Sequence, residues 1–427
     1  MTEGGMGVQQ ILNSPLTAPL KERFLRYVKV CSQSDSAKAD SGIQPSTECQ
    51  WDMANLLRDE LKALGLSDVQ TTDKCYTYAY LPASSGMEGK PSICLLSHID
   101  TVEEVSGKDV KPIIHENYSG EVLTLPYGNV LDPKEDKALA QAGKEGDTII
   151  TSDGNTLLGA DDKAGVSEIM TALEYFVSHP EEKHGRIEVI FSPDEETGHG
   201  MDNVPLELIK SKCAYTVDGG HVAELETECF NAYKSDVVFT GKALHTGTAR
   251  PNMINAINMV SSFVQFLPHH QMPETTDGRM GFYAPMEISG GMETARITLF
   301  LRDFEDEGMK KRLSLVEELA TATAHSYGGE VKVTHTRQYI NMKKNLDMHP
   351  EVERNLVHAY KNAGIEPVFP AIRGGTDGSR LTEMGIPTPN IFTGGHNFHS
   401  RSEWASLSQM VTAVNVLIQL IAEWTKN

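Results

Sequence analysis

The chain has 427 residues, of which 39% are hydrophobic and 23% are charged, proportions typical of globular proteins. Its length exceeds what one ordinary hydrophobic core covers, so two domains are expected. A formal net charge of −21 argues against a nucleic-acid partner, because such binding depends on Lys and Arg displacing counterions from phosphates. No uninterrupted run of 18 apolar residues, as a membrane span requires, occurs in the sequence.

The segment Met1–Gln10 lacks the basic stretch, apolar run and small-residue cleavage site of a signal peptide. A cytoplasmic location is therefore expected. The six cysteines are scattered without a CxxC pair, so the sequence predicts buried thiols rather than a zinc ribbon or a redox motif.

The first half of the chain has the pattern of a layered α/β domain. Apolar residues at helical spacing predict a helix over 53–64, which Gly65 would cap. Short apolar runs at 92–97 and 187–192 predict two buried strands, and 166–176 predicts a helix between them. Strand, helix and strand in this order indicate a central sheet, with sites at its strand ends.

From about Phe230 the pattern changes to that of an inserted unit. Its elements are expected to follow a β-α-β-β-α-β order, the split pattern of a ferredoxin-like sandwich. The placed elements are a strand at 236–240, a helix at 254–267, a strand at 295–301, a helix at 306–325 and a strand at 330–336.

The chain then returns to its first domain. The returning elements are a helix at 350–363, a short strand at 390–393 and an amphipathic helix at 407–421. We therefore predict a discontinuous domain of residues 1–228 and 347–427, with residues 229–346 inserted. Residues 103–147 are polar and rich in Gly and Pro, and we interpret them as an elaborated loop.

Five short clusters carry the residues suited to metal chemistry: Ser97-His98-Ile99-Asp100, Gly159-Ala160-Asp161-Asp162-Lys163, Pro193-Asp194-Glu195-Glu196, Val217-Asp218-Gly219-Gly220 and Asn397-Phe398-His399-Ser400. Two imidazoles and three carboxylates are what a pair of zinc ions needs when one carboxylate bridges both. Taken singly, each cluster is more often structural or solvated, and the Asp161-Asp162 pair also suits a helix N-terminus. Their combination predicts a two-zinc hydrolase.

Spacing within two clusters suggests a division of work. His98 and Asp100 lie two residues apart at a predicted strand end, so both side chains point to one side and the carboxylate can support the ring. Of the adjacent Glu195 and Glu196, one can bind metal while the other stays free to take a proton from water.

At these residues the sequence resembles the M20 family of zinc aminoacyl hydrolases, in particular its tripeptide aminopeptidases. The resemblance spans nearly the whole chain, and the runs TLLGADDKAG, AYTVDGG, IRGGTDG and PNIFTGG occur in the family's order. It implies a zinc-exopeptidase-like α/β/α sandwich, with an inserted ferredoxin-like α+β domain that acts as a lid or in dimerisation.

The resemblance also implies the zinc ligands. His98, Asp161 and Asp218 would hold one Zn²⁺, and Asp161, Glu196 and His399 would hold the other. Asp161 would thus bridge two zinc ions per subunit.

Further roles are carried over by the same resemblance. Asp100 would orient His98, and Glu195 would be the general base and later the proton donor. His245 of the inserted unit would polarise the scissile carbonyl, with an ordinary surface histidine as the alternative. Arg302 and Arg373 would meet the substrate carboxylate as fork-shaped donors, with ordinary salt bridges as the alternative.

The expected function is release of the N-terminal residue from tripeptides by a water that lies between the two zinc ions. His396 stands three residues before His399 and is a rival ligand. Two alternatives stay open: another dipeptidase or N-acyl amino acid amidohydrolase of this family, and a non-catalytic metal-binding or assembly protein. Short peptides are the expected partners, without nucleic acid or membrane, and the resemblance favours a homodimer.

Overall fold

The computed structural model describes residues 7–426, so the first part of the Met1–Gln10 segment and the last residue of the predicted catalytic domain lie outside it. The chain divides into two compact units. Unit 1 comprises Met1–Thr227, Asn345–Pro370 and Thr376–Asn427, and unit 2 comprises Glu228–Lys344 and Ala371–Gly375. The role of unit 2 as a lid or dimerisation domain stays a prediction.

Unit 1 is built on a seven-stranded sheet within the described residues. Its strands, in spatial order, are β1 (Ser67–Thr71), β2 (Thr77–Leu81), β8 (Ile187–Ser192), β3 (Ile93–His98), β9 (Ala214–Gly219), β15 (Asn390–Phe392) and β10 (Leu225–Glu226). The central β8, β3, β9 and β15 run parallel, and the outer strands pair antiparallel. Every residue of β3 and β8 is buried, which confirms the doubly buried strands predicted from their apolar runs.

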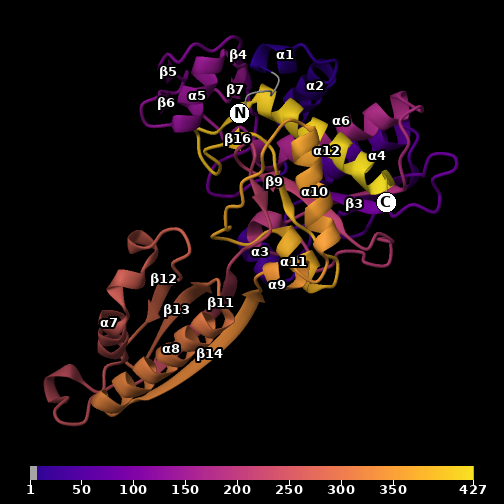
Figure 1. Ribbon diagram of the computed structural model, residues 1–427. Coiled ribbons are helices and arrows are strands. Elements are labelled where there is room, and N and C mark those ends of the chain that lie inside the picture. The colour runs from indigo at the N-terminus through magenta and orange to yellow at the C-terminus, as the bar shows by residue number, and fades with distance from the viewer. Residues whose placement is uncertain (1–6, 427) are drawn as a thin grey trace. The chain divides into compact units, whose positions relative to one another are not determined.

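Helices cover both faces of this sheet (Figure 1). The helices of unit 1 are α1 (Val8–Leu12), α2 (Thr17–Tyr27), α3 (Ser36–Asp40), α4 (Gln50–Ala63), α5 (Lys137–Glu145), α6 (Ala160–Ser178), α10 (Pro350–Asn362), α11 (Asp377–Glu383) and α12 (Leu407–Lys426). Alternate strand residues divide between two cores: Leu95 and Val189 pack with α6 and α12, whereas Leu96 and Ile190 pack with Leu381 of α11. The predicted α/β/α layering is confirmed.

Helix α12 is the one helix of residues 7–426 that is long and apolar enough to cross a membrane. Of its most apolar window, 61% is buried within the protein. It packs against α6 and α10 in the main core of unit 1, which explains its apolar composition.

The segment 103–147 is more ordered than the predicted loop. It contains β4 (Ile113–His115), β5 (Leu123–Thr124), β6 (Val130–Leu131) and α5. Strand β4 joins a second sheet of order β16 (Gly395–His396), β17 (Trp404–Ser406), β7 (Ile149–Thr151) and β4. The loop prediction was wrong here because strands of two or three residues are too short to show an apolar period.

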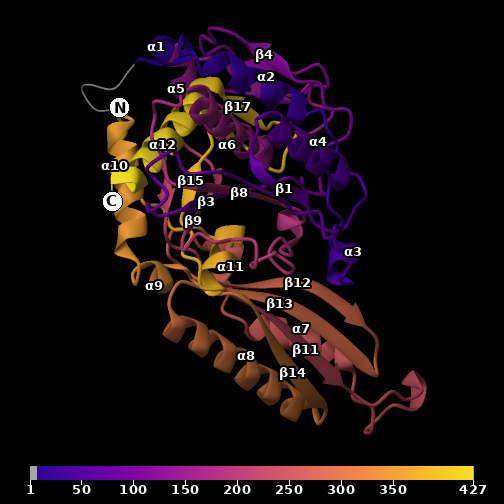
Figure 2. The same cartoon turned by 90° about the vertical axis from the view of Figure 1, so that its right-hand side faces the viewer.

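Unit 2 is a four-stranded antiparallel sheet with two long helices (Figure 2). Its strands, in spatial order, are β12 (Phe282–Gly290), β13 (Thr294–Asp303), β11 (Asn231–Thr240) and β14 (Glu330–Tyr339), and its helices are α7 (Ala256–Phe266) and α8 (Asp306–Tyr327). Both helices pack on β11 and β13 and against each other. The β-α-β-β-α-β order agrees with the expected ferredoxin-like sandwich.

Candidate metal centre

Three of the five predicted ligands, His98, Glu196 and Asp218, lie at or just after the ends of parallel strands of unit 1. His98 is the last residue of β3, and Asp218 is the penultimate residue of β9. Glu195 and Glu196 open the short 3₁₀ turn η1 (Glu195–Thr197), which follows β8. Because β8, β3 and β9 are parallel neighbours, their carboxyl ends bring these side chains to one edge of the sheet.

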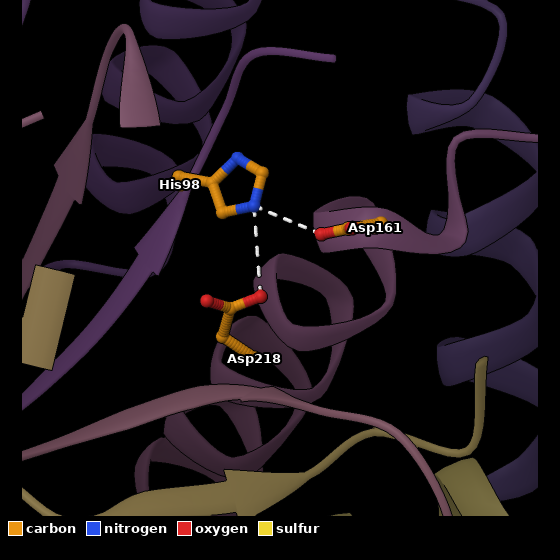
Figure 3. A group of neighbouring side chains, drawn as sticks. All are labelled: His98, Asp161 and Asp218. Carbon is orange, nitrogen blue, oxygen red and sulfur yellow. Dashed lines mark hydrogen bonds and ion pairs between the residues drawn. The ribbon is translucent and has the colours of Figure 1, made fainter. Parts of the chain in front are cut away.

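A first group of donors contains His98, Asp161 and Asp218 (Figure 3). The Nε2 atom of His98 lies 3.0 Å from Oδ1 of Asp161 and 3.6 Å from Oδ1 of Asp218. Asp161 is in the first turn of α6, after Gly159 in a left-handed conformation. The three side chains thus point to a common centre from two strand ends and a helix start.

A second group contains Asp161, Glu196 and His399. The Nε2 atom of His399 lies 3.0 Å from Oδ2 of Asp161 and 3.1 Å from Oε2 of Glu196. Asp161 therefore faces the two groups with its two different carboxylate oxygens. This is the arrangement that a carboxylate shared by two metal ions requires.

Asp100 connects the two groups. Its Oδ1 lies 3.3 Å from Nδ1 of His98, on the ring side away from Asp161. Its carboxylate also accepts hydrogen bonds from the backbone N–H groups of Glu195 (3.0 Å) and Glu196 (3.2 Å). Asp100 thus lies at ion-pair distance from the ring, and it also fixes the segment that carries the two glutamates, which the spacing did not indicate. Its role in orienting His98 stays a prediction.

The electrostatics of the site favour positive charge. Burial opposes a charge on His98, but the nearby carboxylates of Asp100, Asp161 and Asp218 outweigh it and raise the pKa of the ring well above its usual value. Hydrogen bonds to Asp161 and then to Glu196 raise the pKa of His399 to about 11. A metal dication would compete with protons for the same donor atoms, so the donor set fits a metal centre.

Burial also changes the glutamates of η1. Loss of water raises the pKa of Glu195 well above its ordinary value, and the nearby Asp218 raises it further. Burial, followed by the charge of Asp161, raises the pKa of Glu196 to about 8. The raised proton affinity of Glu195 suits an acid–base role beside a cationic centre.

Two further carboxylates hold the ligand segments in place and were missed by sequence reasoning. Asp162 accepts a hydrogen bond from the backbone N–H of His98 at 3.3 Å. Glu403 accepts one from the backbone N–H of Asp161 at 3.1 Å. Asp162 could have been suspected from its position next to Asp161, whereas nothing in the sequence indicates the partner of Glu403.

His396 lies in β16 and belongs to neither donor group among the described residues. Its ring stacks on Trp404 with centroids 4.0 Å apart. Its Nε2 lies 3.1 Å from Oε1 of Gln409, and burial lowers the pKa of the ring to about 3. This geometry supports His399, rather than His396, as the ligand.

His245 belongs to unit 2 and precedes the 3₁₀ turn η2 (Thr246–Thr248). It is exposed, and its Nδ1 accepts a hydrogen bond from the backbone N–H of Gly247 at 3.2 Å. That bond leaves Nε2 as the nitrogen available to a ligand. The proposed contact with a substrate carbonyl stays a prediction.

Arg302 and Arg373 also belong to unit 2. Arg302 is buried in β13 and donates to the carbonyl oxygen of Leu301 at 3.0 Å. Arg373 donates to the carbonyl oxygens of Gly278 (2.7 Å) and Met280 (2.8 Å). Both guanidinium groups therefore have partners in their own unit, and among residues 7–426 neither forms the salt bridge to a carboxylate that was considered as the alternative. Their role in substrate binding stays a prediction.

Two imidazoles and three carboxylates, gathered in two groups that share Asp161, form a candidate metal site of the kind that metal-dependent hydrolases use. The model of peptidase family M20/M25/M40 matches residues 150–423. Peptidase T of Clostridium perfringens strain SM101 is 45% identical over 401 residues, which are 94% of this chain and 97% of that protein. Peptidase T of Geobacillus thermodenitrificans is 44% identical over 405 residues, with the same coverage of both chains.

The chain belongs to peptidase family M20/M25/M40 and is a peptide hydrolase. Its fold matches aminopeptidase PepT of Bacillus cereus with a TM-score of 0.74 at 22% identity, covering 96% of this chain and 98% of that one. It also matches a Bacillus subtilis protein described as a dinuclear metal-binding peptidase of the M20 family, with a TM-score of 0.64 at 14% identity, covering 95% and 98%. The predicted family and fold class are confirmed.

Proposed function

We propose that the protein is a tripeptide aminopeptidase that works with two Zn²⁺ ions. The observation that carries this proposal is the division of the Asp161 carboxylate between two groups of three donors. The relatives named Peptidase T support the substrate class, and so does the likeness to a Staphylococcus aureus structure described as a tripeptidase.

The donor set favours zinc over harder cations. Each group offers one imidazole nitrogen and two carboxylates, which are ordinary zinc ligands, whereas calcium and magnesium sites take oxygen donors. When bound, zinc would polarise the scissile carbonyl and lower the pKa of the attacking water.

Glu195 then acts as the general base. It takes a proton from the attacking water and delivers it to the departing amine, a role that needs a carboxyl group with raised proton affinity. Asp100 holds His98 in orientation, because a carboxylate on Nδ1 fixes which ring nitrogen faces the centre.

The substrate ends explain a preference for short peptides. The free ammonium of a peptide is attracted to the acidic site in unit 1. His245 would polarise the carbonyl, and Arg302 and Arg373 would receive the C-terminal carboxylate by bidentate hydrogen bonds. Groups that recognise both ends of a peptide would favour short substrates.

Hydrolysis of a panel of di-, tri- and tetrapeptides by the zinc-loaded protein tests the substrate class. Faster cleavage of tripeptides, ending in a free N-terminal amino acid, is expected. A preference for dipeptides or N-acyl amino acids would assign the chain to the alternative hydrolases of the family. A cytoplasmic location and a homodimer stay predictions, for cell fractionation and sedimentation to test.

Glu195→Gln tests the general base. The amide keeps the shape of the side chain but cannot accept the proton of water, so kcat should fall by about 10²- to 10⁴-fold while zinc content stays at two ions per chain. Elemental analysis and steady-state kinetics on one preparation check both points. Near-normal kcat would refute the mechanism, and chelation that leaves the wild-type rate unchanged would refute the metal requirement.

A further inference from the structure

Glu403 is a buried carboxylate, with 1% of its surface exposed, that is surrounded by backbone N–H donors. Its Oε2 accepts from the N–H groups of Leu158 (2.7 Å) and Gly159 (2.8 Å), and its Oε1 accepts from that of Asp161 (3.1 Å). All three donors belong to the turn that enters α6, which lies more than 240 residues earlier in the chain.

We propose that Glu403 is a positioning residue for the bridging carboxylate of Asp161. The inference rests on the proposed two-metal centre and assigns Glu403 no contact with substrate. Hydrogen bonds from backbone N–H groups to a buried carboxylate are strong and directional. They fix the backbone from which the Asp161 side chain projects, and hence the direction in which its two oxygens point.

The loop that carries Glu403 also contacts Asp161 through a second residue, His399. His399 precedes Glu403 by four residues, and its ring contacts Asp161 at Oδ2. Directly after Glu403, β17 pairs with β7, which precedes the Leu158–Asp161 turn. The segments 149–161 and 399–406 are therefore joined in three ways: by the pairing of β7 with β17, by the hydrogen bonds to Glu403, and by the contact of His399 with Asp161.

The three donors require both oxygens to be acceptors. In Glu403→Gln the amide would present one oxygen and one NH₂ group of the same size. If the NH₂ faces Asp161, one N–H group loses its acceptor. If it faces Leu158 and Gly159, two lose theirs. Neither orientation of the amide satisfies the turn, so Asp161 should be held less well although the core volume is unchanged.

Asp147 provides a matched control at the other end of the same strand pair. It is 1% exposed and accepts hydrogen bonds from the backbone N–H of Thr148 at 2.7 Å and the hydroxyl of Ser408 at 2.8 Å. It touches none of the proposed ligands or their turns. Asp147→Asn should therefore destabilise the fold around β7 and β17 without weakening metal binding.

Co²⁺ serves as the probe, because its visible spectrum reports coordination directly. Metal-free wild type, Glu403→Gln and Asp147→Asn are titrated with Co²⁺ by absorption and by calorimetry, and thermal unfolding of each is recorded. We expect Glu403→Gln to bind Co²⁺ about 10- to 100-fold more weakly, the usual effect of losing a partner of a metal ligand, with an altered spectrum. Asp147→Asn should keep the wild-type affinity and spectrum.

Superimposable titrations of wild type and Glu403→Gln would overturn the inference and leave the proposed function intact. An equal loss of affinity in Asp147→Asn would also overturn it, because general destabilisation would then be the cause. If wild type itself bound no Co²⁺, the proposed function would fail, and this inference with it. Should Glu403→Gln not fold, Glu403→Asp keeps two acceptor oxygens on a shorter arm, and an affinity equal to wild type would refute the positioning role.

Discussion

Glu168 of α6 is fully buried, and neither of its carboxyl oxygens has a hydrogen-bond partner among residues 7–426. Burial alone raises the pKa of this carboxyl well above its ordinary value. The folded protein therefore favours the neutral, protonated form of this side chain over a wider pH range than the unfolded chain does. Glu168→Met, which has a similar length and no polar oxygen, should increase the stability of unit 1.

The size of the effect has two parts. An unsatisfied buried polar group costs about 1–3 kcal/mol, which the substitution recovers at any pH. The second part depends on pH, because the unfolded chain ionises near the ordinary pKa of Glu while the folded chain does not. A carboxyl group whose pKa is higher in the folded than in the unfolded protein does not lower the free energy of unfolding below about pH 4.3. Above that pH it lowers this free energy by about 1.4 kcal/mol per pH unit, until the pH reaches the pKa of the folded state.

Urea unfolding of the metal-free protein at pH 5 and at pH 7 measures both parts. The three tryptophans of the sequence, Trp51, Trp404 and Trp424, all belong to unit 1, so their fluorescence follows that unit alone. The gain from Glu168→Met should be larger at pH 7 than at pH 5, by at most about 2–3 kcal/mol.

Glu188 is the matched control, because the same substitution there should lower the stability of unit 1 rather than raise it. It is also fully buried, but it accepts hydrogen bonds from the Tyr78 hydroxyl (3.0 Å), Arg186 Nε (3.0 Å) and the backbone N–H of Ser211 (2.8 Å). Glu188→Met should destabilise unit 1 by about 3 kcal/mol or more, because Arg186 and several buried hydrogen-bond donors lose their acceptor. A Glu168→Met variant that is less stable than wild type, or equally stabilised at both pH values, would refute the reasoning.

Two further outcomes are expected. His399→Ala should lose about one zinc per chain together with activity, whereas His396→Ala should keep both metals; the reverse result by elemental analysis would make His396 the ligand. At His199, hydrogen bonds to Asp202 (2.6 Å) and then Asp40 (3.2 Å) raise the pKa to about 9. Its contribution to stability is full below about pH 6.5 and disappears as the pH rises through 9, so His199→Gln should be less stable than wild type at pH 6 and equal to it at pH 10 in thermal unfolding. An unchanged difference across that range would exclude the ion pairs as its cause.

Sequence reasoning predicted best the elements whose environment is uniform. The apolar run 187–192 coincides with β8, because a central parallel strand is buried on both faces and needs no polar residue. It missed β12, which contains Pro285, has an irregular register between Pro285 and Glu287, and exposes Met286 and Ile288. An edge strand of this composition has neither a continuous nor an alternating pattern.

The residues of the candidate site also differ in whether the sequence could predict them. His98, Asp161 and Asp218 could be proposed because the five clusters together suit a pair of metal ions and because these residues match the motifs of the M20 family. The partners of their backbone groups could not be proposed. Asn390, for example, accepts a hydrogen bond from the backbone N–H of Asp218 at 3.1 Å, but an asparagine in a buried strand has no signature of its own. Which distant segment supplies a partner depends on the three-dimensional pairing of strands, which composition and periodicity do not encode.

The pairing of β9 with β15 also sets an order of events during synthesis. Asp218 and Asn390, which meet across these strands, are 172 residues apart. At about 5–20 residues per second, the ribosome needs roughly 9–34 s to add that stretch. Throughout this interval one edge of β9 has no partner strand, while the continuous segment Glu228–Lys344 is complete and can fold. A nascent chain stalled before β15 would therefore present an open, apolar sheet edge in unit 1 after the segment Glu228–Lys344 has been synthesised, and chaperone binding should be concentrated in that window.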